Sequence, residues 1–106
     1  MKIAFNEYSA KLQRVLQQTD WRMVEPLASA LLDAAKSGRQ VFLCGNGGSA
    51  GNAIHLANDY LYGIAPGGHA MKIEALSANS AVLTCLGNDI GYENIFSHQL
   101  KVKAEE

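Results

Sequence analysis

The chain has 106 residues, of which 48% are hydrophobic, 18% charged and 8% aromatic, and these are ordinary values for one folded domain. Nine Lys and Arg residues against ten Asp and Glu residues give a formal net charge of -1, which excludes the strong positive field that direct binding to nucleic acid or an anionic membrane requires. No apolar run approaches the roughly 20 residues of a membrane span, and the N-terminal stretch lacks the apolar core of a signal peptide. We therefore expect a cytoplasmic protein.

Two amphipathic helices are expected at the start of the chain. Apolar residues recur at helical spacing over Phe5–Gln18, so this stretch predicts the first helix. The second helix ends before Gly38, which stands where a C-terminal cap is expected. Its apolar positions are Val24, Leu27, Ala28, Leu31, Leu32 and Ala35. Asp20 is its candidate N-cap, but Pro26 would then lie past the first turn, so the helix either starts near Met23 or bends at the proline.

The next segment follows as strand, turn and helix without a gap. Gln40–Cys44 is a short apolar run of strand-forming residues, and it stops at the glycine-rich turn Gly45–Ser49. From Ser49, a candidate N-cap, small and apolar residues follow helical spacing to about Tyr62. The segment therefore predicts a buried strand joined directly to the N-terminus of a helix.

A second strand and two further helices are expected in the rest of the chain. Gly63–His69 is a loop by composition, and Ala70–Leu76 is the strand candidate. A short helix over Ala81–Leu86 is followed by a last helix over Tyr92–Val102. The candidate caps of the short helix are Ser77, Asn79 and Ser80, and the last helix is expected to face inward with Ile95, Phe96, Gln99 and Leu100.

Strands that alternate with helices predict a parallel sheet with helices on both faces. Only two strands are expected here, whereas a typical sheet has about five or six. We therefore expect the first part of a doubly wound α/β domain that has been cut short. The apolar stripes of the two leading helices offer more surface than two strands can cover, so we also expect a homo-oligomer, a tetramer or a dimer, formed through these helices.

The turn Gly45–Ser49 is the first candidate ligand site, because it lies where open α/β sheets bind ligands, at the carboxyl end of a strand. Glycines let the backbone approach a ligand closely, and the first N–H groups of the helix with the Ser49 hydroxyl supply donors for an anion or a polyol. Neither the P-loop pattern nor the dinucleotide-binding pattern is completed here, which disfavours a nucleotide. The alternative is a tight turn without a ligand, because glycine-rich turns between strands and helices are common.

The helix after this turn carries a polar stripe of Asn52, His55, Asp59 and Tyr62. His55 and Asp59 stand one turn apart, so the imidazole and the carboxylate can meet as an acid/base pair or as two ligands of a divalent metal. The alternative is a solvated face or a simple hydrogen bond between the two side chains. A catalytic zinc site usually takes three protein ligands, so further ligands would have to come from elsewhere.

Asn88 and Asp89 precede Gly91 and follow the second strand, which is consistent with a position at the same end of the sheet as the glycine-rich turn. The alternative is ordinary turn chemistry, because Asn and Asp are common in turns next to Gly.

Four other residues of reactive type are expected to have structural roles. Cys44 and Cys85 lie in apolar settings without the spacing of a metal site, and free cysteine commonly behaves as a small buried hydrophobe, so we expect two buried thiols. His69 and His98 have no partner at a useful spacing, and we expect them to be surface or structural residues.

Two long motifs carry a family resemblance. Residues Cys44–Asp59 read CGNGGSAGNAIHLAND and resemble the sugar isomerase (SIS) domain of bacterial phosphoheptose isomerases, in which a GNGGSA turn is followed by a helix carrying D-A-x-H-x-A-x-E. Residues Ser77–Gln99 are similar to the second segment of this family, in which a Ser/Thr-rich helix start leads to G-N-D-x-G-[FY]-x-x-[IV]-F. The leading helix pair also has the family's placement, so the resemblance spans nearly the whole chain.

The resemblance implies a fold, an assembly and a reaction. The fold is a flavodoxin-like parallel sheet of SIS type, with residues 1–38 as an N-terminal helical pair for oligomerisation and residues 39–106 as the first part of the SIS domain. Members of the family associate as tetramers through their N-terminal helices. Similar enzymes convert sedoheptulose 7-phosphate to a manno-heptose 7-phosphate in heptose biosynthesis, by aldose–ketose proton transfer through an enediol.

The resemblance also implies roles for single residues. Those expected to hold the sugar phosphate or contact the substrate are Asn46, Gly47, Gly48, Ser49, Asn88 and Asp89. His55 would be a zinc ligand. Asp59 stands where the family has a Glu that is both a zinc ligand and the catalytic acid/base.

Two departures from the family pattern bear on activity. Asp59 has one methylene less than Glu, and catalysis is sensitive to a misplacement of about 1 Å. The family's second half, with a serine-rich phosphate loop and a Gln and a His that complete the site, has no counterpart before Glu106. We therefore expect a sugar-phosphate isomerase that is inactive as this chain alone. The alternative is a non-catalytic SIS module that binds a phosphosugar or a protein such as the bacterial replication initiator, since relatives of that kind also lack the Glu.

Overall fold

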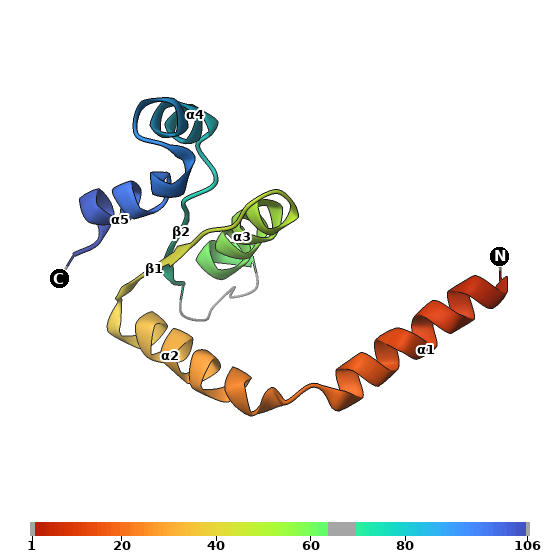
Figure 1. The fold of residues 1–106 in the computed structure, drawn as a ribbon. Helices are drawn as coiled ribbons and strands as arrows, with labels where there is room; N and C mark the ends of the chain where they lie inside the picture. The colour runs from red at the N-terminus through yellow and green to blue at the C-terminus, as the bar shows by residue number, and fades with distance from the viewer. Residues whose placement is uncertain (1, 64–69, 106) are drawn as a thin grey trace. The chain divides into compact units, whose positions relative to one another are not determined.

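The computed structural model describes residues 2–63 and 70–105, so most of the predicted loop Gly63–His69, His69 included, lies outside the described residues. In the described part, the strands are β1 (Gln40–Leu43) and β2 (Lys72–Ala75), and the α-helices are α1 (Lys2–Gln18), α2 (Val24–Ser37), α3 (Gly48–Asn58), α4 (Ser80–Asp89) and α5 (Ser97–Lys103). The shorter helical segments there are the 3-10 helices η1 (Trp21–Met23) and η3 (Tyr92–Asn94) and the π-helix η2 (Asp59–Gly63). The order of α-helices and strands is the predicted one (Figure 1).

The chain divides into two compact units, Met1–Ala30 and Leu31–Glu106. This division falls inside α2. The functional boundary expected after residue 38, between a helical pair and the first part of an α/β domain, stays a prediction.

Asp20 and Arg22 shape the turn that follows α1. Asp20 caps η1 by accepting a hydrogen bond from the N–H of Arg22 at 3.1 Å. The Arg22 guanidinium donates to both carboxylate oxygens of Asp20, which lowers the pKa of Asp20 and raises the pKa of Arg22. Helix α2 begins at Val24, so Pro26 lies in its first turn, where a missing N–H breaks no helical hydrogen bond. Of the two alternatives for this helix, the later start is the observed one.

Gly38 ends α2, as the sequence predicts. Its φ of 69° lies in the left-handed region that glycine adopts without steric cost. Beyond it, the N–H of Arg39 donates to the Ala34 carbonyl at 3.0 Å, which is the closing hydrogen bond of a Schellman motif. The chain therefore leaves the helix and enters β1 within two residues.

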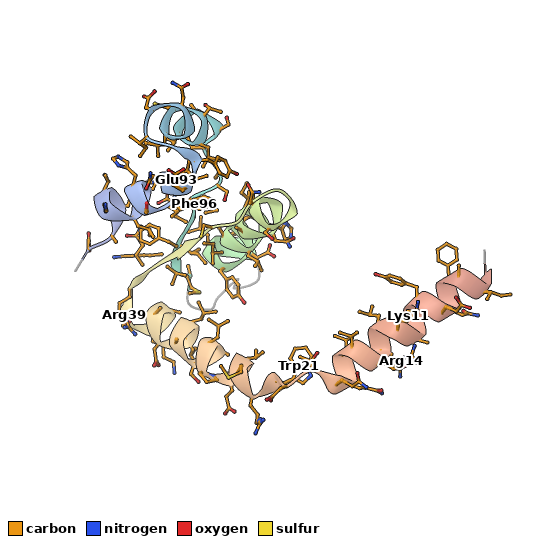
Figure 2. All side chains as sticks on the ribbon, viewed as in Figure 1. Lys11, Arg14, Trp21, Arg39, Glu93 and Phe96 are labelled. Carbon is orange, nitrogen blue, oxygen red and sulfur yellow. The ribbon has the colours of Figure 1, made fainter. Side chains whose placement is uncertain are left out.

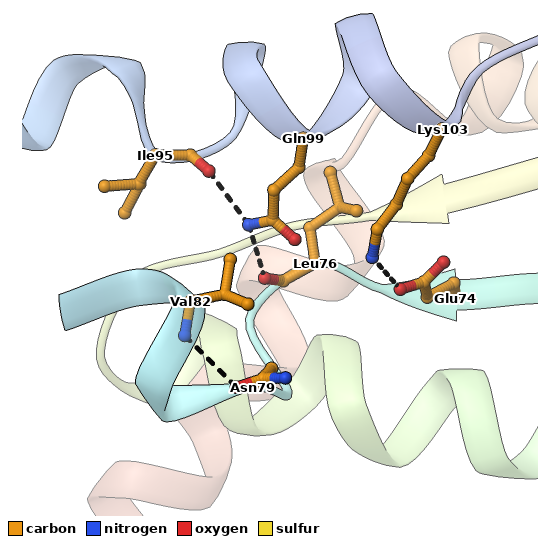
Figure 3. A network of polar contacts seen from close by, with 7 residues as sticks. All are labelled: Glu74, Leu76, Asn79, Val82, Ile95, Gln99 and Lys103. Atoms are coloured by element: carbon orange, nitrogen blue, oxygen red, sulfur yellow. Dashed lines mark hydrogen bonds and ion pairs between the residues drawn. The ribbon is translucent and has the colours of Figure 1, made fainter. Parts of the chain in front are cut away.

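The two strands pair in parallel, with Gln40 opposite Lys72 and Leu43 opposite Ala75. This confirms the predicted parallel sheet. Helix α3 lies on one side of the strand pair and α5 on the other (Figures 1 and 3). Such an arrangement is expected, because parallel strands need crossover connections that return along the faces of the sheet.

The core of the second unit is built on small side chains. Ala53 and Ala57, four residues apart and so on one face of α3, are buried against Ala75 of β2. Leu43 and Ile73 are partly buried against this cluster. The alanines therefore set the contact between α3 and the sheet, as the spacing of small residues in the sequence predicts.

Some burial expectations are wrong. Strand β1 was predicted to be buried, but Gln40 is exposed and the other three residues of the strand are only partly buried. Cys44 and Cys85 are both exposed rather than buried. The last predicted helix is interrupted, with η3 and α5 as separate segments, and Leu100 is exposed although Ile95 and Gln99 are buried as expected. A sheet of two strands offers too little surface for all of the apolar positions to be covered.

Helix α1 carries exposed apolar side chains (Figure 2). Phe5, Tyr8 and Val15 are 66%, 68% and 61% exposed, whereas the Trp21 indole N–H beyond the helix donates to the Leu16 carbonyl at 3.1 Å. Within residues 2–63 and 70–105, no helix has the length and apolar character needed to cross a membrane.

Candidate functional site

The glycine-rich loop, residues 45–49, joins the carboxyl end of β1 to α3. Gly47 has a φ of 54° and occupies the N-cap position of α3 without a side-chain cap, so the prediction that Ser49 is the N-cap is wrong. The Ser49 N–H instead donates to the Asn46 carbonyl at 3.0 Å, which closes a turn. Among the described residues, the N–H groups of Gly47 and Gly48 have no hydrogen-bond partner. Both donors therefore remain available to a ligand at the positive end of the helix.

Gly45 is required where the loop begins. A Cβ at this position would lie 2.4 Å from the carbonyl carbon and oxygen of Ser49, which no side chain tolerates. The backbone of Gly45 is also fastened to the end of β2, because the buried Ser77 hydroxyl donates to the Gly45 carbonyl at 2.9 Å and accepts from its N–H at 3.2 Å. The start of the loop is thus packed closely against the backbone of Ser49 and hydrogen-bonded to Ser77.

The contact of Ser77 with the glycine-rich loop was missed by sequence reasoning, since Ser77 was expected only as a helix cap. The observed cap of α4 is Asn79, whose side-chain oxygen accepts from the N–H of Val82 at 3.1 Å. A Ser directly after a strand, next to a better capping residue, was the available signal.

His55 and Asp59 meet, as their spacing predicts. His55 Nε2 lies 3.3 Å from Asp59 Oδ2, and the side chains are 76% and 25% exposed. Helix α3 ends at Asn58, and the Asp59 N–H is shared between the carbonyls of His55 and Leu56 at the entry to η2. Single π turns of this kind occur often at functional sites. The pair therefore presents an imidazole and a half-buried carboxylate from one helix end.

Asn88 and Asp89 are the last two residues of α4. The Asn88 side-chain amide donates to Asp89 Oδ1 at 2.8 Å, and the Cys85 thiol lies 3.5 Å from Asp89 Oδ2. The hydrogen bond to Asp89, together with the negative charge of its carboxylate, raises the pKa of the Cys85 thiol. Both candidate residues are exposed, and their side chains bond to each other and to Cys85 rather than to the glycine-rich loop.

Tyr92, a second residue that sequence reasoning missed, connects the two candidate segments. Its hydroxyl donates a hydrogen bond to Asn46 Oδ1. The segment after α4 is thereby tied to the glycine-rich loop. The signal was present in the aromatic position of the second motif, because a Tyr there carries a hydroxyl that can reach a polar partner.

The sequence pattern described as the SIS domain matches residues 4–106. The chain belongs to the SIS domain family. The phosphoheptose isomerase of Akkermansia muciniphila is 40% identical over 78 residues, covering 74% of this chain and 41% of the relative. That of Burkholderia pseudomallei strain K96243 is 35% identical over 102 residues, covering 92% of this chain and 52% of the relative. The chain thus spans about half the length of the curated relatives it matches.

A solved structure of phosphoheptose isomerase GmhA from Neisseria gonorrhoeae matches the SIS chain with a TM-score of 0.74 at 28% identity, covering 96% of this chain and 54% of that chain. The fold of the chain is therefore the first half of an SIS fold, which confirms the predicted fold class and the resemblance of the two motifs.

The donors of this SIS chain fit only part of a metal site. Within residues 2–63 and 70–105, no three His, Cys, Asp or Glu side chains come together in a way that could hold an ion. His55 and Asp59 have the right chemistry and separation for two adjacent ligands of zinc. Three protein ligands are usual at catalytic zinc, so this pair by itself does not complete a site.

Proposed function

We propose that the chain supplies the first half of a sugar-phosphate isomerase site of the phosphoheptose isomerase type. The reaction would convert sedoheptulose 7-phosphate to a manno-heptose 7-phosphate by aldose–ketose proton transfer. The observation that carries this proposal is the β1–α3 junction, where two unpaired N–H donors precede an imidazole–carboxylate pair on the same helix. The relatives that share this half of the chain are phosphoheptose isomerases.

The glycine-rich loop is suited to the phosphate or to hydroxyl oxygens of the sugar. The N–H groups of Gly47 and Gly48 and the side chains of Asn46 and Ser49 offer donors around the N-terminus of α3. A helix of 11 residues adds a favourable dipole for an anion at this end. On this proposal Asn88 and Asp89 contact the substrate from the neighbouring segment.

The His55–Asp59 pair is suited to the proton transfer. An aldose–ketose isomerisation removes a proton from the carbon beside the carbonyl and returns one to the neighbouring carbon, so it needs a base that is then an acid. Asp59 is the base of the proposal, and His55 orients its carboxylate from 3.3 Å. If zinc is bound, His55 and Asp59 would be two of its ligands, and the ion would polarise the sugar carbonyl.

The proposal also includes the oligomeric state and the cellular location of the protein. A homo-oligomer, as a tetramer or dimer, is supported by the exposed apolar side chains of the leading helices, which a second copy would cover. A cytoplasmic site of action fits a phosphorylated sugar as substrate.

Binding is the first test of the proposed function. Titration calorimetry of the 106-residue chain with sedoheptulose 7-phosphate should show binding that Gly47→Val weakens, because a branched side chain cannot adopt the φ of 54° at the helix cap. Turnover by the chain alone is expected to be undetectable, since loss of one acid/base group costs about 10²–10⁴-fold and the family's other acid/base lies in its second half. Turnover of this substrate by the isolated chain would contradict that expectation.

A chimera tests the chemistry. In it, this chain replaces the matching 52% of the Burkholderia pseudomallei relative. We expect weak turnover that Asp59→Glu increases and His55→Ala removes, because the longer carboxylate recovers about one bond length of reach. Binding of the phosphosugar without turnover in either the Asp59 or the Glu form would favour the second candidate, a non-catalytic SIS module, for which the shorter carboxylate at position 59 is the supporting observation.

Zinc binding by the chain alone is expected to be weak. Calorimetry with zinc should give low affinity that His55→Ala abolishes, because two ligands hold the ion poorly. Tight one-to-one binding would contradict this and would indicate ligands from a second copy, from His69 or from His98.

A further inference from the structure

The glycine-rich loop and the segment after α4 meet through one side-chain contact. The Tyr92 hydroxyl donates to Asn46 Oδ1 across 46 residues of sequence. Asn46 belongs to the loop that the proposed function assigns to the phosphosugar, whereas Tyr92 follows the Asn88–Asp89 pair. Both side chains are exposed, so a ligand that enters the loop has access to this contact.

The backbone around Tyr92 is well fixed. Gly91 has a φ of 94° and lets the chain turn sharply after α4. The N–H of Asn94 then donates to the Gly91 carbonyl at 3.0 Å, and the Asn94 side-chain amide donates to the Ile90 carbonyl at 2.7 Å. Ile95 is buried and ends the turn. The Tyr92 hydroxyl is therefore a donor in a defined position.

This donor decides which way the Asn46 amide points. A side-chain amide has one oxygen acceptor and one NH2 group, and rotation by half a turn exchanges the two. A hydroxyl that donates to Asn46 Oδ1 leaves the NH2 group directed away from Tyr92. Among the described residues, that NH2 group and the backbone N–H groups of Gly47 and Gly48 are all without a hydrogen-bond acceptor.

We propose that Tyr92 is a positioning residue for phosphosugar binding: its hydroxyl orients the Asn46 amide so that the NH2 group of Asn46 donates to an oxygen of the ligand. This inference rests on the proposed function of the loop. A Phe at position 92 would preserve the ring and its packing but would leave the amide free to turn, so the hydroxyl is the part that acts.

The experiment compares the affinity of the 106-residue chain for sedoheptulose 7-phosphate across variants by titration calorimetry. Tyr92→Phe should weaken binding by about three- to tenfold, the effect expected for one neutral hydrogen bond. Tyr8→Phe is the matched control, because it removes an exposed hydroxyl from α1, and it should bind as the parent chain does. Melting temperatures of all variants should stay close to that of the parent.

A double-mutant cycle separates positioning from a general structural effect. Because Tyr92 acts through Asn46, Tyr92→Phe should have no further effect once Asn46→Ala is present. Asn46→Asp keeps the acceptor for Tyr92 but replaces the NH2 group by a negative oxygen, so it should lose binding more severely than Tyr92→Phe. In the NMR spectrum of the ligand-free chain, the side-chain NH2 signals of Asn46 should shift in Tyr92→Phe and stay unchanged in Tyr8→Phe.

Three results would overturn the inference. Equal affinity of Tyr92→Phe and the parent chain, or additive losses in the double mutant, would overturn it while leaving the proposed function in place. Absence of phosphosugar binding by the parent chain would instead overturn the proposed function, and the inference with it.

Discussion

Gly45 follows β1 and lies against the first turn of α3. Its missing Cβ would lie 2.4 Å from two backbone atoms of Ser49, so Gly45→Ala must push the loop open. We expect Gly45→Ala to lower the free energy of unfolding by about 1–3 kcal/mol, the range for overpacked sites, in urea denaturation.

Gly48→Ala is the matched variant in the same loop. A Cβ there meets no atom within 4 Å, and Gly48 starts α3, so the substitution should be neutral or stabilise the fold by about 0.4–1 kcal/mol. Equal losses in Gly45→Ala and Gly48→Ala would show that the loop does not need the close approach.

The Cys85 thiol gives a pH-dependent readout of Asp89. The neutral thiol donates to the carboxylate, and the thiolate would be repelled by it, so the pKa of Cys85 lies above its usual value. Asp89→Asn removes the negative charge and should lower this pKa. Since the thiolate is the nucleophile, the rate of alkylation at pH 8 should rise, measured in a Cys44→Ser background that leaves one thiol. A slower or unchanged rate would mean that Asp89 does not face the thiol.

At the residue scale, the sequence predicts local contacts and misses distant ones. The meeting of His55 and Asp59 follows from helical spacing alone, and so does the left-handed Gly38. The hydrogen bonds of Ser77 and Tyr92 to the glycine-rich loop join residues 32 and 46 positions apart, and no periodicity in the chain encodes them. The predicted site thus contained the loop but lacked its two anchors.

Gln99 is the buried polar side chain that attaches helix α5 to the segment after β2. This side chain is 4% exposed, and its NH2 group donates to the carbonyls of Leu76 at 3.0 Å and Ile95 at 2.8 Å (Figure 3). Gln99→Leu keeps an apolar fit but leaves a buried carbonyl unpaired. It should therefore lower the free energy of unfolding by about 1–3 kcal/mol.

Lys103→Met is the control on the same helix. It breaks the ion pair with Glu74. Both side chains of this pair are more than a third exposed, so solvent screens their charges and the expected loss in the free energy of unfolding is only about 0–1 kcal/mol. Urea denaturation of the two variants side by side checks the ranking. A loss in Lys103→Met as large as that in Gln99→Leu would contradict the assignment of the attachment to Gln99.

For whole elements, the order of helices and strands was predictable, because each element has a hydrophobic pattern typical of its type or is bounded by residues such as glycine that end helices and strands. The end of α3 was not, since the sequence over Asp59–Gly63 continues a helical pattern while the structure changes to a π turn. The exposure of Cys44 and Cys85 was also beyond prediction from local pattern, because burial depends on how much of each surface the rest of the fold covers.

The whole molecule has a small core for its length. Leu76 is the largest fully buried side chain among the described residues, and many large apolar side chains of both units are exposed. The relatives that the chain matches are about twice as long. Apolar surface therefore remains exposed in the structure of this chain. The rest of such a domain, or another copy of this chain, would cover it.

Helix α1 offers the clearest surface for self-association. A groove of about 500 Å³ runs along it, lined among others by the apolar side chains of Tyr8, Leu12, Leu16 and Trp21. Covering one large aliphatic side chain is worth roughly 1.5–3 kcal/mol, whereas association costs about 4–15 kcal/mol, so several such side chains must be covered together to hold two copies. Lys11 and Arg14 on the same helix are exposed as well (Figure 2).

We expect the chain to form a tetramer or dimer through its leading helices. Leu12→Asp combined with Leu31→Asp should dissociate or unfold it, because each change puts a carboxylate into the apolar stripe of its own helix. Ala10→Asp is the matched control: position 10 lies nearly half a turn away from Leu12 on α1, so the same charge there should leave the assembly intact. Light scattering after size exclusion gives the mass directly. A folded species of 11.4 kDa at micromolar concentration for the parent chain would contradict the expectation, since the exposed stripe would then be stable in water without a partner.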